Sequence, residues 1–456
     1  MVQGQTFIFV VAALFFRQAS GTEIQIYHFN KAINMADLSS RVAEVFSARW
    51  PAWRQGDVVT KARPLHIHLS DHLQKVAAMM ERPGMGRPAD TILALRSQSR
   101  KCSGDTAAFE RFWAGLEHDL IGLIYASDLI DGAGTTLSAT AKLCKAVFRG
   151  EDVDGQIDVD DAEYQQHIGH LQATCRKADL ASVIVSRRQT ICHAKALVYM
   201  IRKVVLEKQP LSEAVMLKTH RILHEGMDTR GKAGRYRGDE VEVAYNEVGE
   251  KKRSGMCIRA SIVPAYMRLV LMHLADENRE AEAGGDVDPY WLAARYMHRI
   301  LMVHPFSDGN GLMSRIVLNV LLLKYAGHVV VLGRTHLDRN EYLRVVRRGR
   351  GHFDAEDMEL GFREQTSHCA IARLVLADSK PSLEWIGDWV DWARRVGAKN
   401  SRVGAKDSRV GAKDSRVGAR DSRVEAEGFE EWWSVETMEA SDEWQVVLSG
   451  RDRKKF

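Results

Sequence analysis

The sequence predicts a mostly α-helical fold with one β-hairpin. Apolar residues recur at helical spacing in long stretches, whereas the alternation typical of a strand pair is convincing only near residues 241–263. Of the 456 residues, 45% are hydrophobic and 27% are charged, which is ordinary for a globular protein. The net charge of +4 gives no reason to expect a nucleic-acid partner, because such proteins usually carry a concentrated basic face.

The N-terminus carries an apolar run from Thr6 to Phe16. The run is too short to span a bilayer but has the length of a signal-peptide core, although no Lys or Arg precedes it. We interpret residues 1–21 as a targeting segment, with a buried helix or strand as the alternative. We expect the rest of the chain to be soluble, and the cytoplasm is slightly favoured over the secretory pathway.

Residues 22–106 form a region of unknown role with a mixed amphipathic pattern. His66, His68 and His72 lie in it at a spacing that could ligate a metal. A metal site needs a further fixed ligand, and nothing nearby in the sequence clearly supplies one. The histidine pattern by itself therefore does not favour a metal.

An amphipathic helix is predicted from Ala107 to Ile130, where aromatic and aliphatic residues recur at helical spacing. It ends in YASDLIDGAGTT, in which Gly132 and Gly134 are natural stop signals. The later stretch GEDVDGQIDVDD (Gly150–Asp161) fits a calcium loop only in part. Its first position is a glycine and its twelfth lacks a glutamate, so we predict a solvated acidic loop.

Further helical pattern covers Thr190 to His224, about Val263 to Asp276, and Pro289 to Val303. Between the first two, Val241 and Val243 alternate with glutamates and a turn-rich stretch follows. This arrangement predicts a β-hairpin.

The string HPFSDGNGLMSR, from His304 to Arg315, precedes a strongly apolar segment that predicts a buried helix capped by Gly327. The sequence Gly309-Asn310-Gly311 therefore lies where a loop becomes a helix N-terminus. Backbone N–H groups converge there and the helix dipole adds positive potential, which predicts a phosphate site. Arg315, one turn into the helix, can add a charged clamp.

Two more side chains of this string suggest chemistry. A carboxylate beside a phosphate site repels phosphates unless a cation bridges them, so Asp308 is interpreted as a Mg²⁺ ligand. An imidazole near neutral pKa is a plausible general base, which is the role we assign to His304. The alternative is a glycine-rich turn that caps a buried helix, with an incidental histidine.

The string closely resembles the active-site motif of the Fic (Fido) family, HPFx(D/E)GNGRxxR. HRILHEGMDTRGKAGRYRGDEVEV, from His220, looks like the family's segment entering its flap hairpin. LDRNEYLRVVRRG, from Leu337, looks like the helix that closes the nucleotide pocket. The resemblance covers about residues 107–375, including what looks like an insertion near 145–188. It implies a Fic-type helical bundle with a small β-hairpin flap.

By this resemblance the protein would transfer AMP from ATP to a hydroxyl side chain of a target protein. His304 would deprotonate that hydroxyl and Asp308 would bind Mg²⁺. Residues 309–311 would hold the α- and β-phosphates, and Arg315 would add a phosphate contact. The flap hairpin would align the protein substrate by strand addition. A homodimer stays open.

Leu312 departs from the family pattern, because it stands where the motif has its first arginine, which helps hold the distal phosphates of ATP. Losing a charge-assisted contact costs roughly 1.5–3 kcal/mol, which is on the order of ten- to a hundred-fold in rate. Two alternatives therefore stay open. One is a catalytically weak Fic-fold nucleotide-binding or interaction protein. The other is an enzyme that removes AMP or transfers another phosphate-containing group. Simple helix packing is the structural interpretation of this leucine.

Ser127, Asp131 and Gly132 match the family's inhibitory-helix pattern (S/T)xxxE(G/N), with Asp in place of Glu. In the family the acid pairs with the second arginine of the motif, here Arg315, and blocks productive ATP binding. Asp is one methylene shorter than Glu, so we expect a loose pair and weakened autoinhibition. An ordinary helix C-terminus is the alternative.

A seven-residue repeat related to RVGAKDS covers Arg395 to Ser422, and a decayed copy follows. A coiled coil would need apolar residues at spacings of three and four, and the glycine in each copy costs about 1 kcal/mol of helix propensity. We therefore predict a flexible linker over 395–429. The tail at 430–456 holds several tryptophans and could dock on the core or bind a partner.

Overall fold

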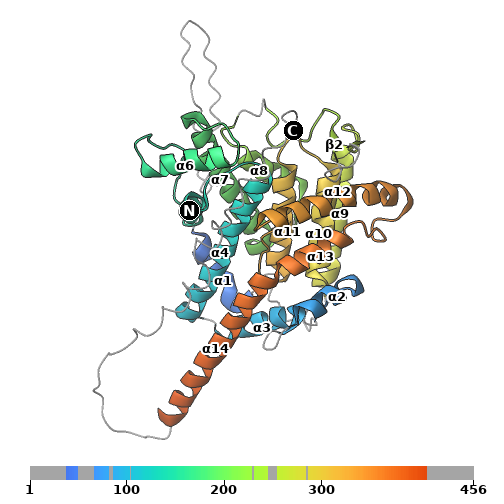
Figure 1. Ribbon diagram of the computed structural model, residues 1–456. Helices are drawn as coiled ribbons and strands as arrows, with labels where there is room; N and C mark the ends of the chain where they lie inside the picture. The colour runs from blue at the N-terminus through green and yellow to red at the C-terminus, as the bar shows by residue number, and fades with distance from the viewer. Residues whose placement is uncertain are drawn as a thin grey trace, which may run out of the picture. The chain divides into compact units, whose positions relative to one another are not determined.

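The computed structural model describes residues 37–49, 66–81, 86–102, 104–227, 231–244, 254–283 and 286–407 (Figure 1). The predicted targeting segment at 1–21 and the C-terminal tail lie outside these residues. The described regular structure is almost wholly helical, which confirms the predicted fold class. No helix among the described residues combines the length and apolarity of a membrane span.

The helices follow one another along most of the described chain. They are α1 (Leu38–Arg49), α2 (Asp71–Met80), α3 (Pro88–Lys101), α4 (Thr106–Ile130), α5 (Leu137–Phe148), α6 (Ala162–Ala173), α7 (Leu180–Met200), the π-helical turn η1 (Ile201–Leu206), α8 (Glu213–Leu223), α9 (Val263–Glu282), α10 (Pro289–Val303), α11 (Asn310–Tyr325), α12 (His336–Glu359), α13 (Cys369–Asp378) and α14 (Lys380–Asp407).

Four short strands form two separate pairs. β2 (Glu242–Ala244) is antiparallel to β3 (Ser254–Met256), which confirms the predicted strand pair of the flap. β1 (His66–Ile67) runs parallel to β4 (Asp286–Val287). This second pair was not predicted, because two-residue strands carry no measurable alternation.

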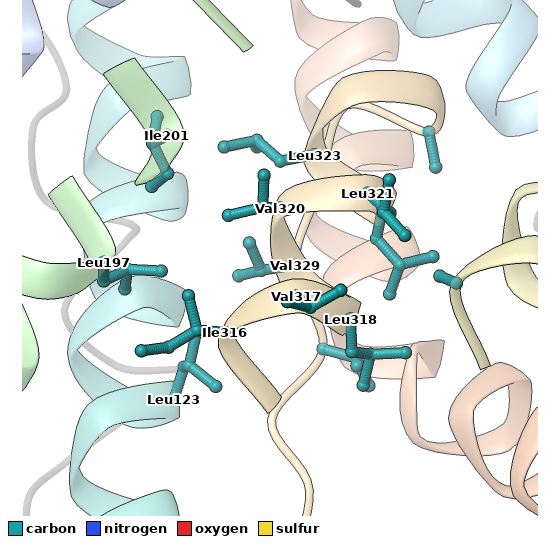
Figure 2. Close-up of a cluster of buried hydrophobic side chains, with 14 of the residues drawn as sticks. Leu123, Leu197, Ile201, Ile316, Val317, Leu318, Val320, Leu321, Leu323 and Val329 are labelled. Atoms are coloured by element: carbon teal, nitrogen blue, oxygen red, sulfur yellow. The ribbon is translucent and has the colours of Figure 1, made fainter. Parts of the chain in front are cut away.

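The helix α11 lies inside the hydrophobic core. Every residue from Met313 to Tyr325 is buried, as expected for a helix in which most residues are apolar. Figure 2 shows Ile316 and Val320 of this helix grouped with Leu197 of α7 and Ile201 of η1. The buried ammonium of Lys324 pairs with Glu282 at 2.7 Å. This burial fixes the orientation of α11 and therefore of the loop that precedes it.

The described helices before residue 106 share this core. The ring of Phe46, in α1, lies 4.5 Å from that of Phe112 in α4 and 5.6 Å from that of Trp389 in α14. The indole of Trp389 in turn donates to the carbonyl of Ala108 at 2.9 Å. The predicted boundary near residue 106 therefore does not separate two hydrophobic cores.

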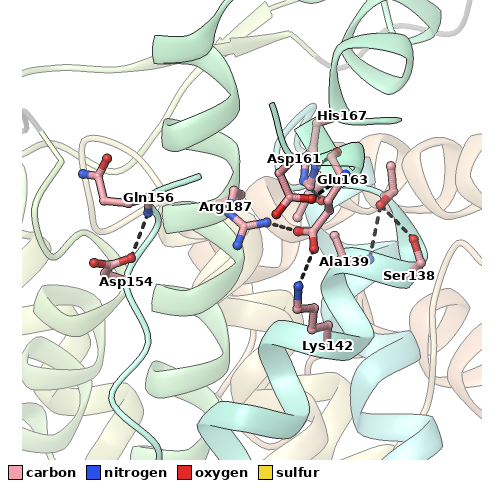
Figure 3. Close-up of polar contacts among 11 residues, drawn as sticks. Ser138, Ala139, Lys142, Asp154, Gln156, Asp161, Glu163, His167 and Arg187 are labelled. Atoms are coloured by element: carbon pink, nitrogen blue, oxygen red, sulfur yellow. Dashed lines mark hydrogen bonds and ion pairs between the residues drawn. The ribbon is translucent and has the colours of Figure 1, made fainter. Parts of the chain in front are cut away.

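The predicted insertion contains the acidic loop and α6. Glu163 lies between two cations there, accepting from Lys142 at 2.7 Å and pairing with Arg187 (Figure 3). In the loop, Asp154 accepts from the backbone N–H of Gln156, and Asp161 caps α6. These carboxylates are mostly exposed and stabilise turns, which confirms the predicted solvated loop.

One helix prediction and one linker prediction differ from the structure in extent. The predicted helix over Thr190–His224 is interrupted between η1 and α8, where Pro210 has no backbone N–H and disfavours helix in the residue before it. The predicted linker begins as helix, because α14 continues to Asp407. Trp385, Ile386 and Trp389 anchor this helix in the core, and extending an existing helix is easier than nucleating one.

Candidate functional site

The helix α10 ends at the candidate base. His304 has left-handed backbone angles (φ 52°, ψ 61°), and its N–H donates to the carbonyl of Ile300 at 3.0 Å. Pro305 follows, and a proline disfavours helical geometry in the residue before it, so the helix ends there. The side chain of Arg237 stabilises this turn, because its Nε donates to the carbonyl of His304 at 2.7 Å.

The protonation state of His304 follows from its surroundings. Burial, and then the nearby charges of Arg237 and Arg350, lower the pKa of the imidazole to about 4. The ring is therefore neutral near pH 7 and can accept a proton. This pKa is lower than the near-neutral value expected from the sequence, because the ring is buried beside two arginines. The neutral ring can still accept a proton from a hydroxyl, but as a weaker base.

The loop after His304 is held by Asn310. Its Oδ1 accepts from the N–H of Phe306 at 2.9 Å, and its Nδ2 donates to the carbonyl of Phe306 at 2.8 Å. Asn310 is 2% exposed, so its side chain shapes the loop from inside. Any ligand contact from Asn310 would come from its backbone N–H.

The first turn of α11 has the properties of an anion site. Gly309 is its N-cap, with φ +73° and no capping side chain. A Cβ on Gly309 would lie 2.6 Å from Cε1 of His224, so only glycine fits there. The first N–H groups of a helix lack intrahelical partners, and the N-cap residue offers no side chain to bond them here.

Asp308 stands exposed at this turn, and its Oδ1 accepts from the N–H of Gly309 at 2.7 Å. Its backbone carbonyl accepts from Nε2 of His220 at 3.1 Å. The His220 ring stacks on Phe306 with centroids 3.9 Å apart, and its Nδ1 accepts from the N–H of Gly234 at 2.8 Å. His220 is thus a neutral Nε2–H tautomer that fixes the carbonyl of Asp308.

Arg315 lies 1% exposed beneath the anion site and faces the end of α4. Its Nε donates to Oγ of Ser127 at 2.6 Å, and its Nη2 lies 2.9 Å from Oδ1 of Asp131. Nη1 lies 3.4 Å from the hydroxyl of Tyr342, in α12. Burial alone would lower the pKa of Arg315, but Asp131 and Tyr342 outweigh it and raise that pKa.

The pair of Asp131 and Arg315 was expected to be loose, and this expectation was wrong. Asp131 is the C-cap of α4, and Gly132 follows it at φ +65°. The end of the helix brings the carboxylate to α11, so the shorter side chain still reaches. A Cβ on Gly311 would lie 3.0 Å from both Arg315 Nη1 and Asp131 Oδ1, so the pair sits directly on the glycine turn.

Leu312 is half-buried at the edge of the hydrophobic core. This position agrees with helix packing, and the side chain offers no hydrogen-bond donor to the anion site. The glycine turn therefore has only one arginine of the motif, and that arginine is engaged by Asp131.

Two arginines that the sequence patterns did not single out join the flap to the site. Arg237 also donates to the carbonyls of Asp239 at 2.9 Å and Ile258. Arg350, in α12, donates to Met302 at 2.7 Å and to Met256 at 2.9 Å. Arg237 lies inside the first segment that resembles the family, and Arg350 directly follows the second, so the sequence carried only a weak signal for them.

The fold and this site define a helical protein with a histidine, a glycine turn at a helix N-terminus, and a paired arginine. Comparison with known families agrees, since the model of the Fic/DOC family matches residues 210–322. Residues 210–322 of the chain therefore carry a Fic domain.

The relatives match over limited stretches. A protein adenylyltransferase Fic of Culex quinquefasciatus is 31% identical over 105 residues, which is 23% of this chain and 21% of the relative. A Fido domain-containing protein of Dictyostelium discoideum is 26% identical over 125 residues, covering 27% of this chain and 79% of the relative. The chain thus spans about a fifth of the length of the Culex protein.

Among solved structures, a Fic domain containing signaling protein of Bacteroides thetaiotaomicron aligns with 66% of this chain and 97% of its own. The TM-score is 0.47 and the sequence identity is 17%.

Proposed function

We propose that this chain transfers AMP from ATP to a hydroxyl side chain of a protein. The observation that carries the proposal is the neutral His304 beside the glycine turn of α11. The printed names of the Culex relative and of a similar protein from Aedes aegypti, both protein adenylyltransferases, agree with it.

In the proposed reaction the hydroxyl oxygen of the target attacks the α-phosphorus of ATP. A new O–P bond forms while the bond to pyrophosphate breaks, and His304 accepts the hydroxyl proton. The N–H groups of Asn310 and Gly311 hold phosphate oxygens at the helix N-terminus, while the N–H of Gly309 donates to Asp308. Arg315 contributes a charge-assisted contact once it is released from Asp131.

Asp308 is the proposed Mg²⁺ ligand. Mg²⁺ is usually held by one or two carboxylates together with substrate phosphates, and an exposed carboxylate beside a phosphate site fits this donor set. The ion, when bound, would offset phosphate charge. Asp308 itself is positioned by the bonds from Gly309 and His220.

The protein substrate is proposed to lie along the flap. The strands β2 and β3 form a two-stranded sheet whose base is tied to the end of α10 by Arg237 and Arg350. Adding an extended segment to this pair would bring a target hydroxyl toward His304.

A second function is favoured by one observation, the apolar Leu312. Without the first arginine of the motif, the site could bind a nucleotide but transfer slowly, or it could act on a different phosphate-containing group. In that case nucleotide binding would be measurable while AMP transfer would not.

The test is incubation of purified protein with Mg²⁺ and α-labelled ATP, followed by intact mass. Wild type and His304→Ala are compared, with nucleotide binding measured for both. We expect label on wild type and at least a hundred-fold less on the variant, since general base catalysis contributes roughly 10²–10⁴-fold. Binding without label in wild type would favour the second function.

A further inference from the structure

A group of metal-binding side chains lies away from the glycine turn, at the pair of strands β1 and β4. Nδ1 of His66 lies 3.1 Å from Oδ1 of Asp286. Ligand atoms of His66, His68 and Asp286 all lie within 4.8 Å of one another. Among the residues that the structure describes, this is the one group of three or more His, Cys, Asp or Glu side chains that converge in this way.

Strand geometry explains why these residues meet. In the parallel register His66 is opposite Asp286, and Ile67 is opposite Val287. The backbone N–H of His68 extends the pairing by donating to the carbonyl of Val287 at 3.1 Å. Successive side chains of a strand point to opposite faces, so His66, His68 and Asp286 share one face. Ile67 and Val287 point into the core on the other.

We propose that His66, His68 and Asp286 form a binding site for a divalent transition-metal ion of the Zn²⁺ type. Imidazole nitrogen and carboxylate oxygen are ligands that Zn²⁺ prefers. Two ligands at about 2.1 Å from a tetrahedral ion lie roughly 3.4 Å apart, which is close to the separation of His66 and Asp286. A ligand atom of His68 lies within 4.8 Å of both, so His68 has to approach by about an ångström to complete the set.

The surroundings of His68 support this assignment. Its Nδ1 is buried and has no hydrogen-bond partner among the described residues. An unpaired buried nitrogen is unfavourable, and a bond to a metal would satisfy it. His68 and Asp286 also line a cavity of about 510 Å³. The cavity gives an ion access to solvent and leaves room for a water molecule or a further ligand.

The other charged groups around this cavity have partners of their own. Glu277 pairs with Arg295 at 2.9 Å, and Glu280 pairs with Arg363 at 2.7 Å. The carboxylate of Asp288 accepts from the N–H groups of Ser70, Tyr290 and Trp291. None of these carboxylates belongs to the converging group, so the site has three protein ligands and an open position.

His72 is close in sequence but does not take part. Its ring stacks on Trp291, with centroids 4.8 Å apart and planes 10° apart. The third ligand is thus not His72, the last histidine of the sequence pattern, but Asp286, which lies more than two hundred residues later in the chain. This difference makes the proposal testable with single substitutions.

A bound ion would join two parts of the chain. β1 precedes the helices α2 and α3, whereas β4 leads directly into α10, whose other end carries His304. An ion that binds only the folded state stabilises it by mass action. We therefore expect added Zn²⁺ to raise the melting temperature.

The test uses the full chain without a histidine tag, and measures Zn²⁺ affinity by competition with a chromogenic chelator. We expect the wild-type chain to bind one equivalent of Zn²⁺ tightly. Asp286→Asn and His68→Ala should each weaken binding by at least about tenfold, since even loss of an outer-shell partner costs ten- to a hundred-fold. His72→Ala, the matched control, should stay within about twofold of wild type.

Folding is checked separately by circular dichroism and thermal unfolding in chelator, where all four proteins should agree. If a variant misfolds, the Co²⁺ spectrum of wild type decides: d–d bands without thiolate charge transfer support the His and carboxylate ligands, and thiolate bands overturn them. The proposal is also overturned if wild type binds no Zn²⁺ tightly, or if Asp286→Asn binds Zn²⁺ with unchanged affinity. An effect of His72→Ala as large as that of His68→Ala would assign binding to the histidine segment alone.

Discussion

At the scale of single residues, Leu312 is where the chain differs from the motif it resembles. It is half-buried on the first turn of α11. An arginine there can lay its stem along the apolar edge and keep its head in solvent beside the glycine turn. We expect Leu312→Arg to raise the rate of AMP transfer ten- to a hundred-fold, since a charge-assisted phosphate contact contributes roughly 1.5–3 kcal/mol. The measurement is a label-transfer time course at fixed ATP.

Leu312→Met is the control for this change, because it preserves volume and adds no charge, and its rate should match that of wild type. If Leu312→Arg is no faster than the methionine variant, the missing arginine does not limit transfer in this chain.

The ion pair of Asp131 and Arg315 gives a second prediction. Asp131→Ala removes the partner at 2.9 Å and leaves Arg315 available to phosphate. Coupling energies between linked sites are typically 1–3 kcal/mol, so we expect self-modification to rise about 5- to 150-fold. Intact mass after incubation with ATP measures it.

Asp131→Glu restores the acid of the family pattern and should keep the rate low. Equal rates for wild type, Asp131→Ala and Asp131→Glu would mean that the pair is structural and holds no inhibitory role.

The sequence identified several residues that the structure brings together, and it missed others. Asp131 and Arg315 were paired from a short pattern, and they do meet. His220 and Arg237 were not singled out, although they fix the carbonyls of Asp308 and His304. Side chains that act through backbone groups leave no spacing signal, so only the folded chain reveals them.

At the scale of elements, the glycine turn before α11 depends on backbone geometry. Gly309→Ala would place a methyl group 2.6 Å from His224 at a positive φ. Strained backbone of this kind costs on the order of 1–3 kcal/mol, so we expect a loss of stability in that range together with weaker nucleotide binding. Urea unfolding and nucleotide titration measure the two effects.

Gly169→Ala is the matched control, because Gly169 lies in α6 with nothing within 4 Å of an added Cβ. The free energy of unfolding of this variant should exceed that of wild type by roughly 0.5–1 kcal/mol, because alanine is favoured over glycine in a helix. Equal effects at the two positions would mean that backbone strain at Gly309 is not the cause.

Element boundaries were predictable where local signals are strong. The bounds of α10 agree with prediction, because Pro289 can start a helix and the His304-Pro305 step can end one. The extension of α14 into the repeats depends on tryptophans that pack on distant helices. The pairing of β1 with β4 depends on residues far apart in the chain. Contacts of this kind have no local signature.

At the scale of the whole molecule, the helices before residue 106 are predicted to unfold together with the Fic domain. Phe46 is buried against Phe112 and Trp389, so Phe46→Ala should lower the free energy of unfolding by about 3–5 kcal/mol. Chemical denaturation followed by fluorescence and circular dichroism should show one shared transition.

Met79→Ala serves as control, since Met79 is 72% exposed in the same region and should change stability by less than about 0.5 kcal/mol. A separate, early transition that alone shifts in Phe46→Ala would contradict a shared core.

The contact between Asp131 and Arg315 also has a consequence for nucleotide affinity at equilibrium. If Arg315 serves either the carboxylate or a phosphate, only molecules with the pair open are competent to bind. Were one molecule in a hundred open, the apparent Kd would be about a hundred times the intrinsic value. A partner that held α4 away from α11 would then increase nucleotide occupancy without touching the nucleotide. By the same coupling, saturating nucleotide would increase the affinity of the chain for that partner by the same factor.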